Sequence, residues 1–557
     1  MIVQPRKLWH TVRYLHLGQI YGRIAFRLFR PAPDLAPAPT LRVRYGNFQL
    51  PARRLPSLIG SDVFFFLNET GSLANHGWDD PGKAKLWRYN QHYFDDLNST
   101  DALQRTAWHL CLLSDWINKN VPGKGSGWEP YPTSLRIVNW IKWVLAGNEL
   151  SNLALDSLAI QARWLVRRLE YHLLGNHLFA NAKALIFAGC FFSGKEAAVW
   201  LKTGLDILEK EIPEQILADG GQFERSTMYH ALAVEDMLDL LNVLGQLVRS
   251  PDEHSNSLLK PIVEAQEAIE QRLPPMLRWM NIMRHPDGEI AFFNDAAFGI
   301  APSCDELLQY AARLGIEPGY LSENQAMVLQ QSGYVRLSNP LACLLFDAAP
   351  IGPDYVPGHA HADTLSIELS LFGKRVFVNS GTSEYGVSTE RHRQRGTAAH
   401  NTVEINNENS SEVWSGFRVA RRAYPYAQRL ETDDEIQVYS AWHSGYQRLS
   451  PPVSVGRRLQ LQPGSLLIED MIEGPFKSAV SRFHCHPTVT VTRISAARLQ
   501  LTLPGGQIVL LQVEGDADVS IQPVTWHPRF GVTEPNQCIV ISMLANKLIT
   551  QLEWSQS

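Results

Sequence analysis

Two patterns of apolar positions divide the chain near residue 325. Before that point apolar residues recur every three or four positions, as Ile137, Trp140, Ile141 and Val144 do, which is typical of amphipathic helices. The same periodicity predicts helices over 101–119, 151–172, 178–192, 195–211, 226–248, 257–283 and 303–314. Short links punctuated by glycine, proline, serine or asparagine separate these segments. Helices joined in this way without intervening strands form a bundle, a solenoid or a toroid.

After Gly333 the apolar positions alternate with polar ones. The alternation is clear over 364–371, 401–405 and 435–439, which predicts strands. Pro463-Gly464 and the Pro-Gly-Gly run at 504–506 have the composition of hairpin turns. Helices first and strands second indicate two packed domains of the α+β multidomain class, rather than an interleaved α/β sheet.

The size of the chain agrees with this division. Its 557 residues exceed one ordinary core, so we expect two domains or one large domain with a second. The six cysteines stand singly, without metal-ligand or redox spacing, and are expected to be buried free thiols. A net charge of −5 indicates no nucleic-acid partner, so attraction for an acidic ligand would require a local basic patch.

The first 33 residues differ from the rest of the chain in charge. They contain no acid, and their basic residues are Arg6, Lys7, Arg13, Arg23, Arg27 and Arg30. Apolar residues recur there at helical spacing: Leu8, Val12, Leu15, Ile20, Ile24 and Leu28. We expect a leading helix docked on its own domain, and the alternative is peripheral contact with an anionic membrane. The segment lacks the contiguous apolar stretch of a secretory signal, and no run has the length of a membrane span.

Two polar clusters fall in the helical half. Gly175-Asn176-His177 opens a predicted helix, where an asparagine is usually a cap. The second cluster leads from a Gly-Gly loop at 220–221 into another helix, with Ser226 as a plausible cap. Its polar residues are Glu224, Arg225, Tyr229 and His230.

Two further clusters fall in the β half. If 357–363 is extended, His359, His361 and Asp363 project from one face, an arrangement that suits a metal or an acid–base site. The last cluster runs from Asn379 through a basic stretch at 391–395 to His400-Asn401. Its arginines, including Arg393 and Arg395, would bind carboxylate or sulfate unless they are ordinary surface charge. A strand histidine at 400 facing His361 would complete a metal pair.

Together these motifs resemble the heparinase II/III polysaccharide lyases. The resemblance is carried, in order, by Asn176-His177, by Gln222-Phe-Glu-x-Ser-x-x-Tyr229-His230, by Gly358-His-x-His-x-Asp363, by Ser380-Gly-Thr and by His400-Asn-Thr-Val403. It implies an N-terminal α/α toroid (91–322) followed by an antiparallel β-sandwich (323–557), after a basic helix and lead-in segment (1–90). It also implies a periplasmic or cell-envelope location, whereas the N-terminus favours a cytoplasmic or membrane-peripheral one.

The activity that the resemblance implies is β-elimination at a uronic acid of an acidic polysaccharide, for example in bacterial exopolysaccharide metabolism. Asn176 would hydrogen-bond the carboxylate with help from His177, Tyr229 would be base and acid, and His359 a base on the other sugar face. Glu224, Arg225, His230, Arg393 and Arg395 would bind substrate. Arg225 or a histidine would lower the pKa of Tyr229.

The resemblance also implies one divalent metal, zinc or calcium, and no organic cofactor. His361 and His400 match the two histidine ligands, but Asn379 stands where an aspartate is expected. A neutral amide is a weaker ligand than a carboxylate, so Asp363 would replace it or the site would be empty.

Two other functions are compatible with the sequence. One is a glycoside hydrolase with Glu129 and Glu224 as acids, because toroids also host paired-carboxylate catalysis. The other is a polysaccharide-binding or assembly factor without catalysis, which the Asn379 substitution and the N-terminus permit.

Overall fold

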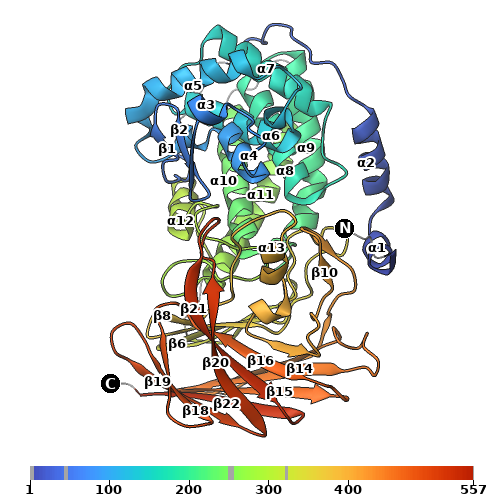
Figure 1. Cartoon of the computed structure of the whole chain (residues 1–557). Helices are drawn as coiled ribbons and strands as arrows, with labels where there is room; N and C mark the ends of the chain where they lie inside the picture. The colour runs from blue at the N-terminus through green and yellow to red at the C-terminus, as the bar shows by residue number, and fades with distance from the viewer. Residues whose placement is uncertain (1–4, 43–47, 249–255, 320–323, 434, 556–557) are drawn as a thin grey trace.

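The computed structural model describes residues 5–42, 48–248, 256–319, 324–433 and 435–555. Helices occupy one end of the molecule and sheets the other (Figure 1). The predicted order of a helical toroid followed by stacked antiparallel sheets is confirmed. The predicted boundary at 322/323 lies outside the described residues. The one at residue 90 falls inside a helix whose Trp87 belongs to the toroid core, so the lead-in segment is shorter than predicted.

Each helix expected between 101 and 314 is present, with its ends moved by a few residues. The helices share one apolar core rich in tryptophan, including Trp116, Trp140 and Trp200. They are α3 (Leu73–His76), α4 (Lys85–Tyr93), α5 (Thr106–Lys119), α6 (Pro130–Leu145), α7 (Asn152–Val166), α8 (Gly175–Phe191), α9 (Lys195–Gln215), α10 (Thr227–Val248), α11 (Leu259–Ile282) and α12 (Cys304–Arg313).

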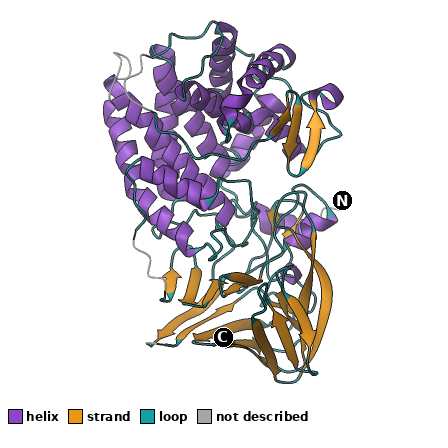
Figure 2. Cartoon of the chain, turned by 90° about the vertical axis from the view of Figure 1, so that its left-hand side faces the viewer, coloured by secondary structure: helices purple, strands orange, loops and turns teal. Residues whose placement is uncertain are grey.

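A small antiparallel sheet, which the sequence analysis did not predict, precedes these helices and lies beside them (Figure 2). It consists of β1 (Leu58–Gly60), β2 (Val63–Phe66) and β3 (Glu69–Ser72). Its strands have only three or four residues, too few for a two-residue period to stand out. Phe64 and Phe66 point into the toroid core.

Over its described residues the C-terminal half contains four antiparallel sheets. The first sheet after the toroid along the chain has five strands. Its order is β4 (Met327–Leu329), β5 (Tyr334–Asn339), β6 (Ala342–Asp347), β7 (Ile367–Leu371), β8 (Lys374–Phe377). A four-stranded sheet has the order β20 (Ala517–Trp526), β21 (Glu534–Met543), β16 (Ala479–His484), β9 (Val403–Ile405). The pair β10 (Val413–Trp414) and β11 (Arg418–Val419) stands apart, and a short helix, α13 (Thr389–Gln394), precedes it.

The largest sheet has eight strands and, with the other two large sheets, encloses a second apolar core. Its order is β12 (Pro425–Thr432), β13 (Gln437–His443), β14 (Ser454–Gln462), β15 (Ser465–Glu473), β22 (Lys547–Trp554), β19 (Ile508–Glu514), β18 (Arg498–Thr502), β17 (Thr490–Arg493). The two predicted turns join β14 to β15 and β18 to β19.

Strand β7 shows how the two halves are joined. Polar residues alternate with apolar ones at 364–371, yet every residue of β7 is buried. Its polar positions face the toroid, because Glu368 and Ser370 bind the two ring nitrogens of His285 at 2.8 and 2.7 Å. An apolar cluster that includes Trp279 and Leu345 adds to this interface. The two domains therefore meet over a packed surface that fixes their relative position.

The basic N-terminal segment forms two helices, α1 (Pro5–Val12) and α2 (Leu17–Leu28). They lie along one side of the molecule, with α2 beside the helical half and α1 close to β10 (Figure 1). Thr11 Oγ1 donates to the Val419 carbonyl at 3.2 Å, and Arg168 donates to the Phe26 carbonyl at 2.7 Å. The segment is docked as expected, but the apolar side chains at 20, 24 and 28 point outward. Over the described residues no helix is both long and apolar enough to cross a membrane.

Candidate active site

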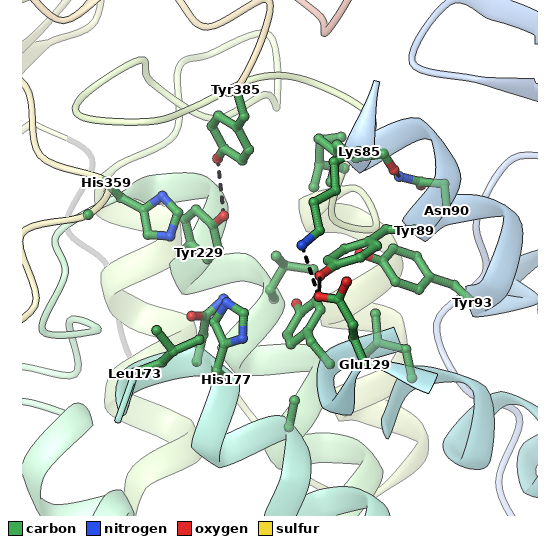
Figure 3. Close-up of a pocket in the computed structure, with 18 of the residues that line it drawn as sticks. Lys85, Tyr89, Asn90, Tyr93, Glu129, Leu173, His177, Tyr229, His359 and Tyr385 are labelled. Atoms are coloured by element: carbon green, nitrogen blue, oxygen red, sulfur yellow. Dashed lines mark hydrogen bonds and ion pairs between the residues drawn. The ribbon is translucent and has the colours of Figure 1, made fainter. Parts of the chain in front are cut away.

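A cavity of about 2340 Å³ lies between the toroid and the β-domain. Asn176, His177, Glu224 and Tyr229 line it from the toroid, and His359 lines it from the loop before β7. Figure 3 shows His177, Tyr229 and His359 turned toward the same space. Asn176, Tyr229 and His359, to which the family resemblance assigns one reaction, therefore line one interdomain cavity, while their chemical roles stay predictions.

Asn176 and His177 occupy the first turn of α8. Gly175 before them has a φ of +55°, which favours glycine, and a Cβ there would lie 3.3 Å from Glu224 Oε1. The glycine thus lets the helix begin directly against Glu224. Among the described residues no partner holds the Asn176 carboxamide, so it is free to bind a ligand in the cavity.

His177 is paired with an acid behind it. Its Nδ1 lies 3.2 Å from Glu170 Oε1, and its ring packs 4.6 Å from that of Tyr131. Burial lowers the pKa of His177, but the Glu170 carboxylate outweighs that effect and leaves the pKa raised. The imidazolium form therefore persists to higher pH than in an ordinary histidine.

Tyr229 lies in the first turn of α10, which Ser226 caps as predicted by accepting the Tyr229 N–H at 3.1 Å. Its hydroxyl is 3.1 Å from that of Tyr385. Burial, followed by Tyr385, raises the pKa of Tyr229 well above its ordinary value. The expectation that Arg225 or a histidine lowers this pKa is wrong, and Tyr229 is held as a neutral acid.

His359 packs on Tyr229, with ring centroids 3.9 Å apart. Its Nδ1 is 2.9 Å from Asp295 Oδ2, and its Nε2 is 3.9 Å from Glu224 Oε2. Because Asp295 is ionised, the proton between the two groups lies on Nδ1, and in the neutral ring Nε2 then holds the lone pair. That nitrogen is oriented as a base.

Asp295, in the loop after α11, was not predicted, and it connects most of the site. It is fully buried and accepts hydrogen bonds from His359, from His361 Nε2 at 2.8 Å and from Arg391 Nη2 at 2.7 Å. Burial alone would raise the pKa of Asp295, but Arg391 and the two histidines hold it well below its usual range. A permanent carboxylate thus orients both histidines.

Glu224 is a buried acid at the cavity wall, 2 % exposed. Its Oε1 accepts a long bond from Gln222 at 3.4 Å, while Oε2 has no hydrogen-bond partner. Burial raises the pKa of Glu224. An unpartnered carboxyl oxygen beside Asn176 and His359 is available to a bound sugar.

The facing wall of the cavity comes from α4 and the start of α6. Lys85 Nζ is 2.9 Å from Glu129 Oε2, and the Tyr89 hydroxyl donates to the same oxygen. Figure 3 shows this group opposite Tyr229 and His359. Lys85 and Tyr89 were not predicted as site residues, because they lie in a helix whose sequence pattern is ordinary.

Four predicted substrate contacts lie elsewhere. Arg225, with a φ of +58°, donates to the Ser332 carbonyl at 2.9 Å. His230 is buried and bonds the Met276 carbonyl at 3.0 Å, and burial lowers its pKa to about 4. Successive helical residues point about 100° apart, which turns His230 away from the cavity when Tyr229 faces it.

The two arginines of the basic stretch are also structural. Arg393 pairs with Glu390 at 2.6 Å. Arg395 is buried and donates to the Ala360 carbonyl at 2.8 Å, so it supports the backbone between His359 and His361. The expectation that Arg225, His230, Arg393 and Arg395 contact substrate is therefore wrong.

Behind the cavity wall, His361 Nδ1 and His400 Nε2 are 3.3 Å apart, close enough for one cation to bridge them, as predicted. Asp363 completes the group, with ligand atoms of all three within 4.8 Å. Neither histidine lies in a strand, contrary to the prediction. The Asn379 carboxamide oxygen accepts the Asn401 N–H at 3.1 Å, and the carboxylate grouped with the two histidines is that of Asp363.

Both domains match family models. Residues 97–299 match the heparinase II/III N-terminus, and residues 323–555 match the heparinase II/III-like C-terminal domain. A solved structure described as heparinase III superposes with a TM-score of 0.66 at 16 % identity, over 98 % of this chain and 86 % of that one. The chain belongs to the heparinase II/III family, and the shared fold is the toroid with its β-domain.

The share of a relative's length that aligns with this chain differs among the curated relatives. A heparin-sulfate lyase of Bacteroides stercoris is 31 % identical over 44 % of this chain and 38 % of its own length. A protein of Caulobacter vibrioides called FtsZ-localized protein C is 26 % identical over 86 % of this chain and 83 % of its own. The chain spans between 36 % and 51 % of the length of the heparin-sulfate lyases it matches.

Proposed function

We propose that the chain is a polysaccharide lyase that cleaves a uronic-acid-containing acidic polysaccharide by β-elimination. The observation that carries this proposal is the meeting of Asn176, Tyr229 and His359 on one interdomain cavity. Elimination needs a group to neutralise the carboxylate, a base and an acid. Asn176 would neutralise the carboxylate, His359 would be the base and Tyr229 the acid. The names of the heparin-sulfate lyases support the same substrate class.

The carboxylate would bind at the first turn of α8. There the Asn176 carboxamide donates to one oxygen and His177 adds positive charge, reinforced by the helix N-terminus. Both interactions strengthen as negative charge builds up on the carboxylate during proton removal. Stabilisation of that charge is the largest requirement of the reaction.

Proton transfer would divide between Tyr229 and His359. His359 Nε2 removes the α-proton, because Asp295 holds the ring with that nitrogen free. The electron pair forms the carbon–carbon double bond as the bond to the leaving oxygen breaks. Tyr229, neutral at rest, gives its proton to that oxygen. The tilted rings, with centroids 3.9 Å apart, place base and acid on one side of the sugar, so the elimination would be syn. This differs from the expectation that His359 acts on the other sugar face.

Two alternatives are kept for stated reasons. Glu129 and Glu224 both line the cavity, so a hydrolase with paired carboxylates remains testable. A non-catalytic polysaccharide-binding or assembly factor is favoured by the relative matched along most of both chains, which is named for its location rather than for an activity.

One assay separates the three functions. The protein is incubated with uronate-containing polymers, including exopolysaccharide of its host, while ultraviolet absorbance and reducing ends are followed. A lyase raises both, because the product contains a conjugated double bond. A hydrolase raises only the reducing ends, and a binding factor raises neither. Reducing ends without absorbance would contradict the proposal.

The pH dependence of substrate binding should report on His177. Its raised pKa means that positive charge is present at low pH and is lost as pH rises through that pKa. We expect KM for a uronate oligosaccharide to rise about tenfold across that range, the value of a charge-assisted hydrogen bond of about 1.5 kcal/mol. In His177→Gln this rise should disappear while kcat keeps its own pH profile. If KM of His177→Gln rises with pH as it does in the unaltered protein, His177 does not bind the carboxylate.

We also propose that His361, Asp363 and His400 hold one divalent metal, zinc or calcium. His361 Nδ1 and His400 Nε2 face each other 3.3 Å apart, and the donor set of two imidazoles and a carboxylate suits zinc. The metal would lie behind Asp295, where it would supply charge and rigidity rather than contact the sugar. Elemental analysis of the purified protein, with His400→Ala as control, tests this: equal metal content in both would contradict it.

A further inference from the structure

Helix α2 carries a stripe of apolar side chains that its own chain leaves uncovered. Leu17, Tyr21, Ile24 and Leu28 are spaced by four, three and four residues, which places them on one face. Their exposed fractions are 84, 75, 54 and 80 %. None of the four lines the cavity. The stripe therefore faces away from the molecule.

The opposite face of α2 is the one that docks. Gln19 Nε2 donates to the Tyr355 carbonyl at 3.1 Å, and the Phe26 ring lies 4.3 Å from that of His172. A Cβ at Gly22 would meet His172 at 3.3 Å, so the helix backbone fits closely there. An amphipathic helix normally buries its apolar stripe. Here docking uses the other face and leaves the stripe for a different environment.

The exposed apolar surface continues beyond α2. Trp9 on α1 is 66 % exposed, and Phe29 after α2 is 58 % exposed. Exposed apolar patches of this kind mark interaction sites on soluble proteins. Together with Tyr21 these side chains give the patch three aromatic rings, which favour the boundary between water and lipid.

The charge of the segment selects among partners. Residues 1–33 contain six basic residues and no acid, in a chain whose net charge is −5. Arg6 and Arg13 are exposed and lie outside the cavity lining, whereas Arg23, Arg27 and Arg30 line the cavity. Exposed arginines on the same segment as an apolar stripe complement anionic phospholipids, which satisfy both features at once.

We propose that α1 and α2 form a membrane-binding surface for anionic phospholipid bilayers. The stripe would enter the boundary between headgroups and acyl chains, and Arg6 and Arg13 would contact the phosphates. Because the docked face of α2 also lines the cavity, binding would hold that wall of the cleft beside the bilayer. The proposal stands independently of the lyase activity.

Vesicle co-sedimentation of the full-length protein tests this proposal. Binding is compared on vesicles of phosphatidylglycerol and phosphatidylcholine and on phosphatidylcholine alone, at low and high salt. We expect binding to the anionic vesicles, weakened by salt. Leu17→Gln/Ile24→Gln/Leu28→Gln should lower that binding by roughly tenfold or more, because it removes most of the inserted apolar area.

A matched variant controls for general loss of surface apolarity. Leu103, Leu153 and Leu544 are 77, 51 and 59 % exposed and lie outside α1 and α2. Leu103→Gln/Leu153→Gln/Leu544→Gln should bind vesicles as the unaltered protein does. Both variants should have the same midpoint of thermal unfolding as the unaltered protein. Equal vesicle binding by the two variants, or no binding by the unaltered protein, would overturn the proposal. So would a self-associated dimer that only the α2 variant abolishes, because a second copy would then cover the stripe.

Discussion

Replacing Tyr229 by phenylalanine should reduce kcat/KM for elimination by roughly 10²–10⁴-fold, the usual contribution of a positioned acid. The substitution deletes the hydroxyl that would protonate the leaving oxygen, and it leaves the ring stacked on His359. Polymer binding should change little, because the carboxylate contacts at Asn176 and His177 stay in place. Initial rates of ultraviolet absorbance increase, with a binding titration, measure the two effects separately.

The control for this variant is a buried tyrosine away from the cavity. Tyr439, 2 % exposed, donates its hydroxyl proton to Gln428 at 2.7 Å in the β-domain. Tyr439→Phe removes a similar hydrogen bond and should leave the elimination rate unchanged. Near-normal turnover in Tyr229→Phe would show that this residue is not the acid, whatever the overall reaction is.

Replacing Asp295 by alanine should lower the free energy of unfolding by about 3–5 kcal/mol, the cost of breaking a buried ion pair. The change leaves the guanidinium of Arg391, itself fully buried, without its carboxylate. It also removes the bonds that orient His359 and His361. Urea unfolding followed by tryptophan fluorescence measures the loss, provided that the transition is cooperative.

A double variant separates the ion pair from the packing. Arg391→Met alone should also be costly, because it leaves Asp295 buried without its cation. Asp295→Ala/Arg391→Met should cost clearly less than the sum of the two single changes, since no charge is left unpaired. Additive losses would mean that the two side chains do not depend on each other.

The sequence was most informative where structure is local. Helical periodicity and two-residue alternation arise within a few residues of chain, so the helices from α5 to α12 and the three strands β7, β9 and β13 were predicted with small errors at their ends. The pairing of His361 with His400 was predicted from their types and from the family pattern. The burial of β7 on both faces was not, because it depends on His285 of the other domain.

The site was predicted less completely because its residues are far apart in the sequence and come together only in the folded protein. Asp295 accepts bonds from residues more than sixty positions away, and only its place in an apolar run at 290–298 marked it as a buried acid. Arg225 and His230 were assigned by adjacency in sequence, whereas a positive φ and the helical turn direct them elsewhere. Side chains at neighbouring positions of a motif need not point toward the same site.

The outward stripe on α2 illustrates the same limit. Its periodicity predicted an amphipathic helix correctly, and docking was the expected use of its apolar face. The structure docks Gln19 and Phe26 instead. Which face of a helix is buried depends on the surface against which it packs, and the sequence pattern of the helix does not specify that surface.

The most direct test of the central claim is the mass of the products formed from a defined uronate oligosaccharide. Elimination divides the chain without adding water, so one product contains an unsaturated uronate and is lighter by one water than the corresponding hydrolysis product. We predict that this species appears with the unaltered protein and is strongly reduced with Tyr229→Phe. Products that have all gained a water, or an intact oligosaccharide bound without cleavage, would contradict the assignment of the Asn176–Tyr229–His359 cavity as a lyase site.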